Sequence, residues 1–108
     1  MKRGDIVIVS APGQYGNPRP AVVIQSDGLT MTESVLVCLL TSEVEEAPYF
    51  RLTLQPNNGN GLTATSQVMV DKIVALPRTK CSGPVGSLDP TEVMALNQRL
   101  TVVIGLAD

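Results

Sequence analysis

Short apolar runs, separated by polar or glycine- and proline-rich segments, make up most of the chain. Runs rich in β-branched and aliphatic residues with such boundaries predict strands rather than helices. Residues 35–40 are apolar on both faces and are expected to form the central strand, whereas residues 49–55 alternate as a half-buried strand does. The other predicted strands are residues 6–10, 19–25, 66–70 and 72–76.

The C-terminal segment has a different period. Asp89 offers an N-cap, Pro90 a first helical residue and Glu92 a capping-box partner. Gly105 is a suitable stop. Apolar residues recur between them at helical spacing: Val93, Leu96, Leu100, Val103 and Ile104. The pattern predicts a mainly β fold, with one C-terminal α-helix packed on a strongly curved antiparallel sheet. The length of 108 residues fits a single domain, 1–108.

Two segments are predicted as loops from their turn-forming residues. Residues 11–18 hold two glycines and two prolines, and residues 56–61 contain three asparagines, two glycines and a proline. The first of these loops leads directly into Arg19.

Charge and composition narrow the function classes. The net charge of −2 excludes a uniformly basic nucleic-acid binder, so any RNA site must be a local patch. Histidine is absent, which excludes histidine metal ligands and the usual histidine general base, and no metal or cofactor is expected.

The two cysteines indicate a reducing environment. Cys38 and Cys81 have no CxxC spacing; Cys38 is expected as a buried thiol in a core strand, and Cys81 lies in a predicted Gly/Ser/Pro loop. A cytoplasmic location is the expectation, with no signal peptide and no membrane-spanning segment.

Four polar residues at strand ends or within apolar runs are candidates for chemistry. Arg19 places a cation at the start of an apolar strand, where it either pairs with Asp27 or a glutamate or stays available for an anion. Thr41 ends the central strand, either as a site residue or as a terminator bonded to nearby backbone. Asp71 interrupts an apolar run, where an acid needs a partner, and the alternative is a bulge or turn with a solvated Asp. Lys72 is the fourth candidate, and the alternative is that it is simply exposed to solvent.

Four motifs in order resemble the MazF/PemK-type endoribonuclease toxins, and the resemblance covers almost the whole chain. They are Gly4-Asp5-Ile6-Val7, Arg19-Pro20-Ala21-Val22-Val23, Leu40-Thr41-Ser42 and Ser66-Gln67-Val68-Met69-Val70-Asp71-Lys72-Ile73.

The resemblance implies an SH3-like barrel with a C-terminal helix, a homodimer whose interface forms RNA grooves, and neutralisation by a cognate antitoxin protein. It also implies metal-independent cleavage of single-stranded RNA at short sequences. Arg19 matches the family's catalytic arginine, Thr41 its catalytic Ser/Thr position, and Asp71 an acidic position proposed as the base in some members.

Other residues are expected to contact RNA, with Tyr15 as a base-stacking residue or a lid. The full set is Gln14, Tyr15, Asn17, Ser42, Arg51 and Lys72. The chain departs from the family pattern at three points. The loop before Arg19 lacks the usual Glu, Lys72 stands where Gln is common, and Met69 stands where some members have Arg.

Two other functions use the same fold. One is a toxin that poisons DNA gyrase through its C-terminal helix, although the final residues 104–108 give that function little support. The other is a catalytically inert interaction module, against which Arg19 and Thr41 argue weakly.

Overall fold

The computed structural model describes residues 1–10 and 17–108, and in these residues six strands precede one long helix. The elements are β1 (Asp5–Val9), β2 (Arg19–Val23), β3 (Ser34–Thr41), β4 (Arg51–Leu54), β5 (Ser66–Pro77), a 3-10 turn η1 (Arg78–Lys80), β6 (Cys81–Ser87) and α1 (Pro90–Val103). The mainly β fold with a C-terminal helix is therefore confirmed.

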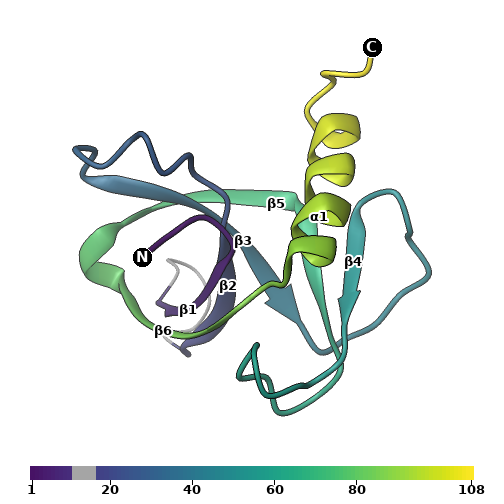
Figure 1. The fold of residues 1–108 in the computed structure, drawn as a ribbon, viewed down its shortest axis with the longest axis horizontal. Coiled ribbons are helices and arrows are strands. Elements are labelled where there is room, and N and C mark those ends of the chain that lie inside the picture. The colour runs from purple at the N-terminus through teal and green to yellow at the C-terminus, as the bar shows by residue number, and fades with distance from the viewer. Residues whose placement is uncertain (11–16) are drawn as a thin grey trace.

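The strands form one antiparallel sheet in the order β4-β5-β3-β2-β1-β6. Figure 1 shows this sheet curling around, with α1 standing beside β4 and β5. The long strand β5 pairs with β3 along most of its length and with β4 through its first residues. The predicted strong curvature of the sheet is confirmed.

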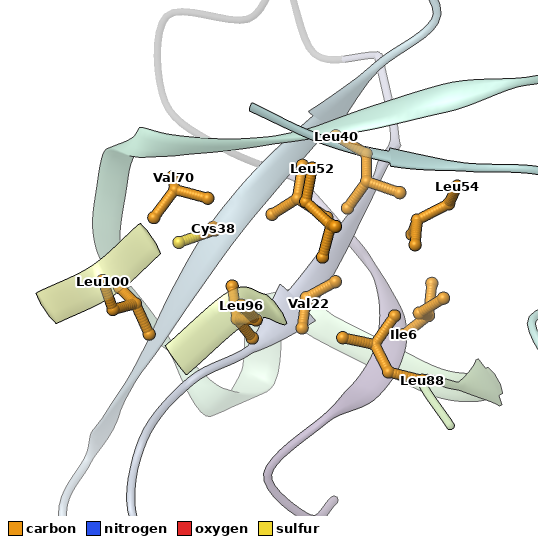
Figure 2. Packing of buried hydrophobic residues seen from close by; sticks show 11 residues of the cluster. Ile6, Val22, Cys38, Leu40, Leu52, Leu54, Val70, Leu88, Leu96 and Leu100 are labelled. Carbon is orange, nitrogen blue, oxygen red and sulfur yellow. The ribbon is translucent and has the colours of Figure 1, made fainter. Parts of the chain in front are cut away.

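Alternating side chains divide the apolar residues between two clusters, one on each face of the sheet. The helix side is packed by Leu96 and Leu100, which meet residues such as Val22, Cys38 and Leu40 (Figure 2). The concave side holds the alternate residues of the same strands: Val7, Val9, Ala21, Val23, Val35, Val37, Leu39, Met69 and Leu76. Burial on both faces explains why residues 35 and 37–40 are apolar, whereas Leu36 is exposed.

The helix begins as the sequence predicts. The Asp89 carboxylate accepts a hydrogen bond from the Glu92 backbone N–H at 2.7 Å, and the Glu92 carboxylate accepts one from the Asp89 N–H at 2.9 Å. This reciprocal capping box satisfies two backbone donors that the first turn leaves without partners. No helix in the described residues is long and apolar enough to cross a membrane.

The predicted bounds of β4 and β5 are wrong. Tyr49 and Phe50 lie in a turn, so β4 begins only at Arg51. The two short strands predicted at 66–70 and 72–76 are one strand, whose pairing with β3 shifts in register between Cys38 and Leu40. That shift is a bulge in β5, which places extra residues opposite Leu39 and accounts for the polar interruption in the sequence.

The predicted loop around Cys81 is the sixth strand, which pairs with β1. Its composition hides it, because glycine and proline are typical of turns. Glycine is needed at Gly86 since a Cβ there would collide with the backbone of Asn60. Asn60 is fully buried and fastens the loop after β4 through its side-chain bonds to the backbone of Gln55, Asn57 and Leu62.

Candidate active site

Arg19 and Thr41 end two neighbouring strands at the same edge of the sheet. Ala21 of β2 pairs with Leu39 of β3, and the antiparallel register continued by two residues sets Arg19 opposite Thr41. Both residues share the concave face with Ala21 and Leu39, because side chains two apart on a strand point the same way. Each is partly buried.

Two open cavities meet at this pair. The first, of about 470 Å³, runs from Arg19 and Thr41 toward the loop before β5. The second, of about 540 Å³, runs from the same pair toward the bulge of β5. The described residues that line the first also include Pro20, Leu40, Ser42, Glu43, Leu62, Thr63, Ala64 and Ser66. Those that line the second also include Leu39, Glu43, Val44, Glu45, Arg51, Met69 and Lys72.

The Thr41 hydroxyl is held from one side. Its Oγ1 accepts a hydrogen bond of 3.1 Å from the backbone N–H of Glu43. This bond is the strand-terminator contact that the sequence left open as an alternative. A hydroxyl has one donor and two acceptor sites, so the Thr41 proton remains available to a ligand in either cavity.

The guanidinium of Arg19 makes no ion pair and no side-chain hydrogen bond with residues 1–10 or 17–108. Asp27, the partner considered from the sequence, instead accepts a 2.7 Å hydrogen bond from the backbone N–H of Arg3. Within the same residues the ion pair that forms joins Arg51 to Glu45, at 2.7 Å. With respect to the described residues, the Arg19 donors are therefore available for an anion in the cavities, as a phosphate site requires.

The structure separates Asp71 from Lys72. Lys72 is exposed and lines the second cavity with Arg19. Asp71 is exposed but lines neither cavity. Its carboxylate raises the pKa of Cys38, whose side chain belongs to the helix-side cluster. The structure therefore does not place Asp71 among the described residues that line the cavities shared by Arg19 and Thr41.

The remaining predicted RNA contacts fall into four groups. Ser42 is exposed and lines the first cavity. Asn17 is exposed and is not among the described residues that line either cavity. Arg51 lines the second cavity with a side chain only 10% exposed. Gln14 and Tyr15 lie outside the described residues.

Two parts of the site were missed in the sequence. Glu43 lines both cavities, and residues 62–64 form a wall of the first. Glu43 stands two positions after Thr41, which is the signal that marks it as a neighbour of the strand end. Nothing in residues 62–64 marks them, because their position depends on how the Asn60 turn folds back.

The buried thiol is chemically inert at neutral pH. Burial, and secondarily the Asp71 carboxylate, raises the pKa of Cys38 from 9.0 to about 12, although Arg3 acts in the opposite direction. The thiolate is the nucleophilic form of cysteine, so Cys38 is no nucleophile here. Across the described residues, no three Cys, Asp or Glu side chains gather in a way that suits a metal ion.

Comparisons with known proteins place the whole chain in one family. Residues 2–104 match the model of the PemK-like, MazF-like toxins of type II toxin-antitoxin systems. The chain is 37% identical over 108 residues to a probable endoribonuclease MazF of Mycolicibacterium smegmatis, covering 99% of both proteins.

Solved structures show the same fold at lower identity. A mycobacterial endoribonuclease in complex with its cognate antitoxin superposes with a TM-score of 0.83 at 20% identity, covering 98% of this chain and 96% of that one. A MazF toxin of Mycobacterium tuberculosis gives a TM-score of 0.81 at 19% identity over 94% and 96% of the two chains. MazF in a MazE–MazF crystal from Deinococcus radiodurans gives 0.77 at 20% identity over 97% and 95%. By the family model and the close relative, this chain belongs to the PemK-like, MazF-like toxins of type II toxin–antitoxin systems.

Proposed function

We propose that this MazF-like endoribonuclease toxin cuts single-stranded RNA, mRNA above all, at short sequences, by attack of the substrate's own 2′-hydroxyl and without a metal ion. The observation that carries the proposal is the pairing of Arg19 with Thr41 at the meeting point of two cavities. A guanidinium that has no side-chain partner among the described residues, beside a hydroxyl donor, suits a phosphodiester. We place the activity in the cytoplasm, where mRNA is available.

The reaction needs little from the protein. The 2′-oxygen loses its proton and attacks the adjacent phosphorus, and the bond to the 5′-oxygen breaks. That oxygen takes up a proton from Arg19 or from water, so the products carry a 2′,3′-cyclic phosphate and a 5′-hydroxyl. Arg19 binds the non-bridging oxygens and stabilises the charge that grows on the phosphorane. Thr41 donates its hydroxyl proton in a hydrogen bond to the same group. A guanidinium is a donor with no acceptor site, so Arg19 is suited to charge stabilisation or to acid catalysis rather than to the role of base.

We assign the acceptance of the 2′-hydroxyl proton to Glu43. A general base must come within hydrogen-bond reach of the proton that it takes. Glu43 lines both cavities with Arg19 and Thr41, whereas Asp71 lines neither. Asp71 remains the alternative that the family resemblance implies, and the two carboxylates are distinguished by mutation below.

The path of the RNA follows the two cavities. Lys72, which is exposed, supplies a second cation beside the partly buried Arg19. Because Arg51 is paired with Glu45, these two cations outnumber the remaining carboxylate, Glu43, and the second cavity is locally basic on an acidic protein. Ser42 and residues 62–64 would contact the nucleotides in the first cavity. Gln14, Tyr15 and Asn17, in and beside the loop that leads into Arg19, stay proposed RNA contacts.

We extend the proposal to a homodimer that a cognate antitoxin neutralises, as the complexes of MazF relatives suggest. An apolar cavity of about 440 Å³ between α1 and the sheet supports a protein contact on that side. Its edges carry large apolar side chains that are exposed in the isolated chain: Leu36, Ile104 and Leu106.

A cleavage assay on a long single-stranded transcript, in a buffer containing a metal chelator, tests the proposed function. The purified protein should produce discrete fragments, and the Arg19→Ala protein should not. An intact transcript would refute the endoribonuclease and leave the gyrase poison or the inert module. Cleavage that appears only when magnesium replaces the chelator would refute the metal-independent reaction.

A further inference from the structure

The loop of residues 42–47, which follows Thr41, is hydrogen-bonded to the buried side-chain amide of Gln67. Gln67 of β5 is 3% exposed. Its Oε1 accepts a hydrogen bond from the Glu45 N–H at 3.0 Å, and its Nε2 donates one to the Glu45 carbonyl at 2.9 Å. A second Nε2 bond, 3.1 Å long, reaches Oγ1 of Thr53 in β4. One side chain thus satisfies both backbone groups of Glu45, as a strand partner would.

Arg51 of β4 holds the same loop from beside Gln67. Its Nη1 donates to the Glu43 carbonyl at 3.2 Å and to Oε1 of Gln67 at 3.1 Å, while Nη2 donates to Oε1 of Glu45 at 2.7 Å. The Nε atom is buried and has no partner among the described residues. We call Arg51, Gln67 and Glu45 the loop clasp. Its arginine has most of its donors committed to protein acceptors, unlike Arg19.

The loop clasp acts on the site through Glu43. The Glu43 carbonyl accepts from Arg51, and the Glu43 N–H donates to Oγ1 of Thr41. The two bonds flank one residue, so the guanidinium that fixes the carbonyl also orients the peptide next to the Thr41 hydroxyl. Loss of the clasp would release both Thr41 and the Glu43 carboxylate from their places in the cavities.

Resting on the proposed function, we propose that Arg51 and Gln67 are positioning residues of the RNA site. They hold residues 42–47 so that Thr41 and Glu43 meet the scissile phosphate, and Arg51 does not bind RNA phosphate itself. The sequence predicts the opposite role for Arg51, a direct RNA contact. The two roles differ in what they do to salt dependence, because each lost phosphate contact on a single strand lowers the slope of log K against log salt by about 0.7.

The test compares Arg51→Met with Lys72→Met, since Lys72 lines the same cavity and makes no side-chain hydrogen bond with the described residues. Binding of an RNA made uncleavable by 2′-deoxy substitution at the cut is measured over a series of salt concentrations, and cleavage is measured in single turnover at saturating RNA. Lys72→Met should weaken binding and flatten the salt slope. Arg51→Met should leave the slope unchanged and slow the saturated rate at least tenfold.

Two further variants keep the test decisive. Arg51→Lys should fail to rescue the rate, because one ammonium does not reproduce a planar fork that serves three acceptors. If Arg51 instead bound RNA phosphate as a simple positive charge, the exchange to lysine would be tolerated. Glu45→Gln removes the charge of an exposed partner and leaves the buried side chains intact, so it should fold even if Arg51→Met does not. Glu45→Gln should also lower the saturated cleavage rate and leave the slope of the salt dependence of binding unchanged.

The positioning role has a readout that needs no RNA. Amide hydrogen exchange at Glu43 and Glu45 should quicken in Arg51→Met and in Glu45→Gln, and not in Lys72→Met. If the wild-type protein leaves RNA intact while the variants show this exchange pattern, the proposed function is refuted and the loop clasp is not. A flattened salt slope with an unchanged saturated rate in Arg51→Met, or an unaltered exchange rate at both amides, overturns the positioning role.

Discussion

The backbone N–H of Glu43 donates a 3.1 Å hydrogen bond to Oγ1 of Thr41. This bond occupies an acceptor site of the hydroxyl and leaves its proton for a ligand. It also ties the end of β3 to the first residues of the following loop, where Glu43 enters both cavities beside Arg19. The hydroxyl, the carboxylate and the guanidinium of the proposed site thereby depend on one local turn.

Arg19→Ala is expected to fold normally and to lose cleavage by about a hundredfold or more, the usual cost of removing a donor that stabilises transition-state charge. The fold should survive because Arg19 makes no side-chain bond with the described residues. Single-turnover cleavage together with thermal unfolding measures both effects. A folded variant that cuts at the wild-type rate would exclude Arg19 from the site.

Thr41→Ser should keep most of the activity, and Thr41→Val should lose about a hundredfold, because only the valine lacks the hydroxyl donor. The valine also leaves the Glu43 N–H without its acceptor, at a cost of about 1 kcal/mol in the free energy of unfolding. Rates and urea unfolding of both variants provide the check. A valine variant with full activity and a large loss of stability would make Thr41 a strand terminator only.

Glu43→Gln should slow cleavage about a hundredfold, the lower range for a lost general base. Asp71→Asn should retain the wild-type rate, because Asp71 lines neither cavity. Single-turnover cleavage rates of the two variants distinguish the carboxylates. A wild-type rate in Glu43→Gln with a hundredfold loss in Asp71→Asn would transfer the base role to Asp71.

Stability at alkaline pH should depend on Cys38. The folded chain holds the thiol proton more tightly, with a pKa of about 12 against 9.0 for an ordinary thiol. The unfolded chain therefore loses the proton first, and stability that is complete below about pH 9 is lost as the pH rises toward about 12. Urea unfolding of the wild type should weaken more steeply over this window than that of Cys38→Val. Parallel losses in the two proteins would contradict the raised pKa.

Much of the fold could be predicted because its signals are local. The capping box of Asp89 and Glu92 is written in adjacent residues, and the two-sided apolar run at 35–40 indicates a central strand. The strand β6 could not be predicted, since its turn-forming residues are strand only through pairing with β1. The single strand β5 was predicted as two strands, because a bulge inserts the polar Asp71 and Lys72 into an otherwise apolar strand.

Part of the candidate site could be predicted from the sequence. Arg19 and Thr41 stand at strand ends, and adjacent antiparallel strands bring such ends together. Glu43 enters the site only because Gln67 and Arg51, distant along the chain, hold its loop. A sequence pattern marks Arg51 as one more cation, and only its hydrogen bonds show that it is already engaged.

The chemical ends of the RNA fragments test the central claim most directly. Mass spectrometry of a cleaved oligonucleotide should find a 2′,3′-cyclic phosphate on the upstream fragment and a 5′-hydroxyl on the downstream one. The same oligonucleotide with one 2′-deoxy nucleotide on the 5′ side of the cut should bind, resist cleavage and inhibit cutting of ordinary RNA, because backbone charge supplies most of the affinity. Fragments with a 5′-phosphate, or undiminished cleavage of the deoxy substrate, would contradict attack by the 2′-hydroxyl.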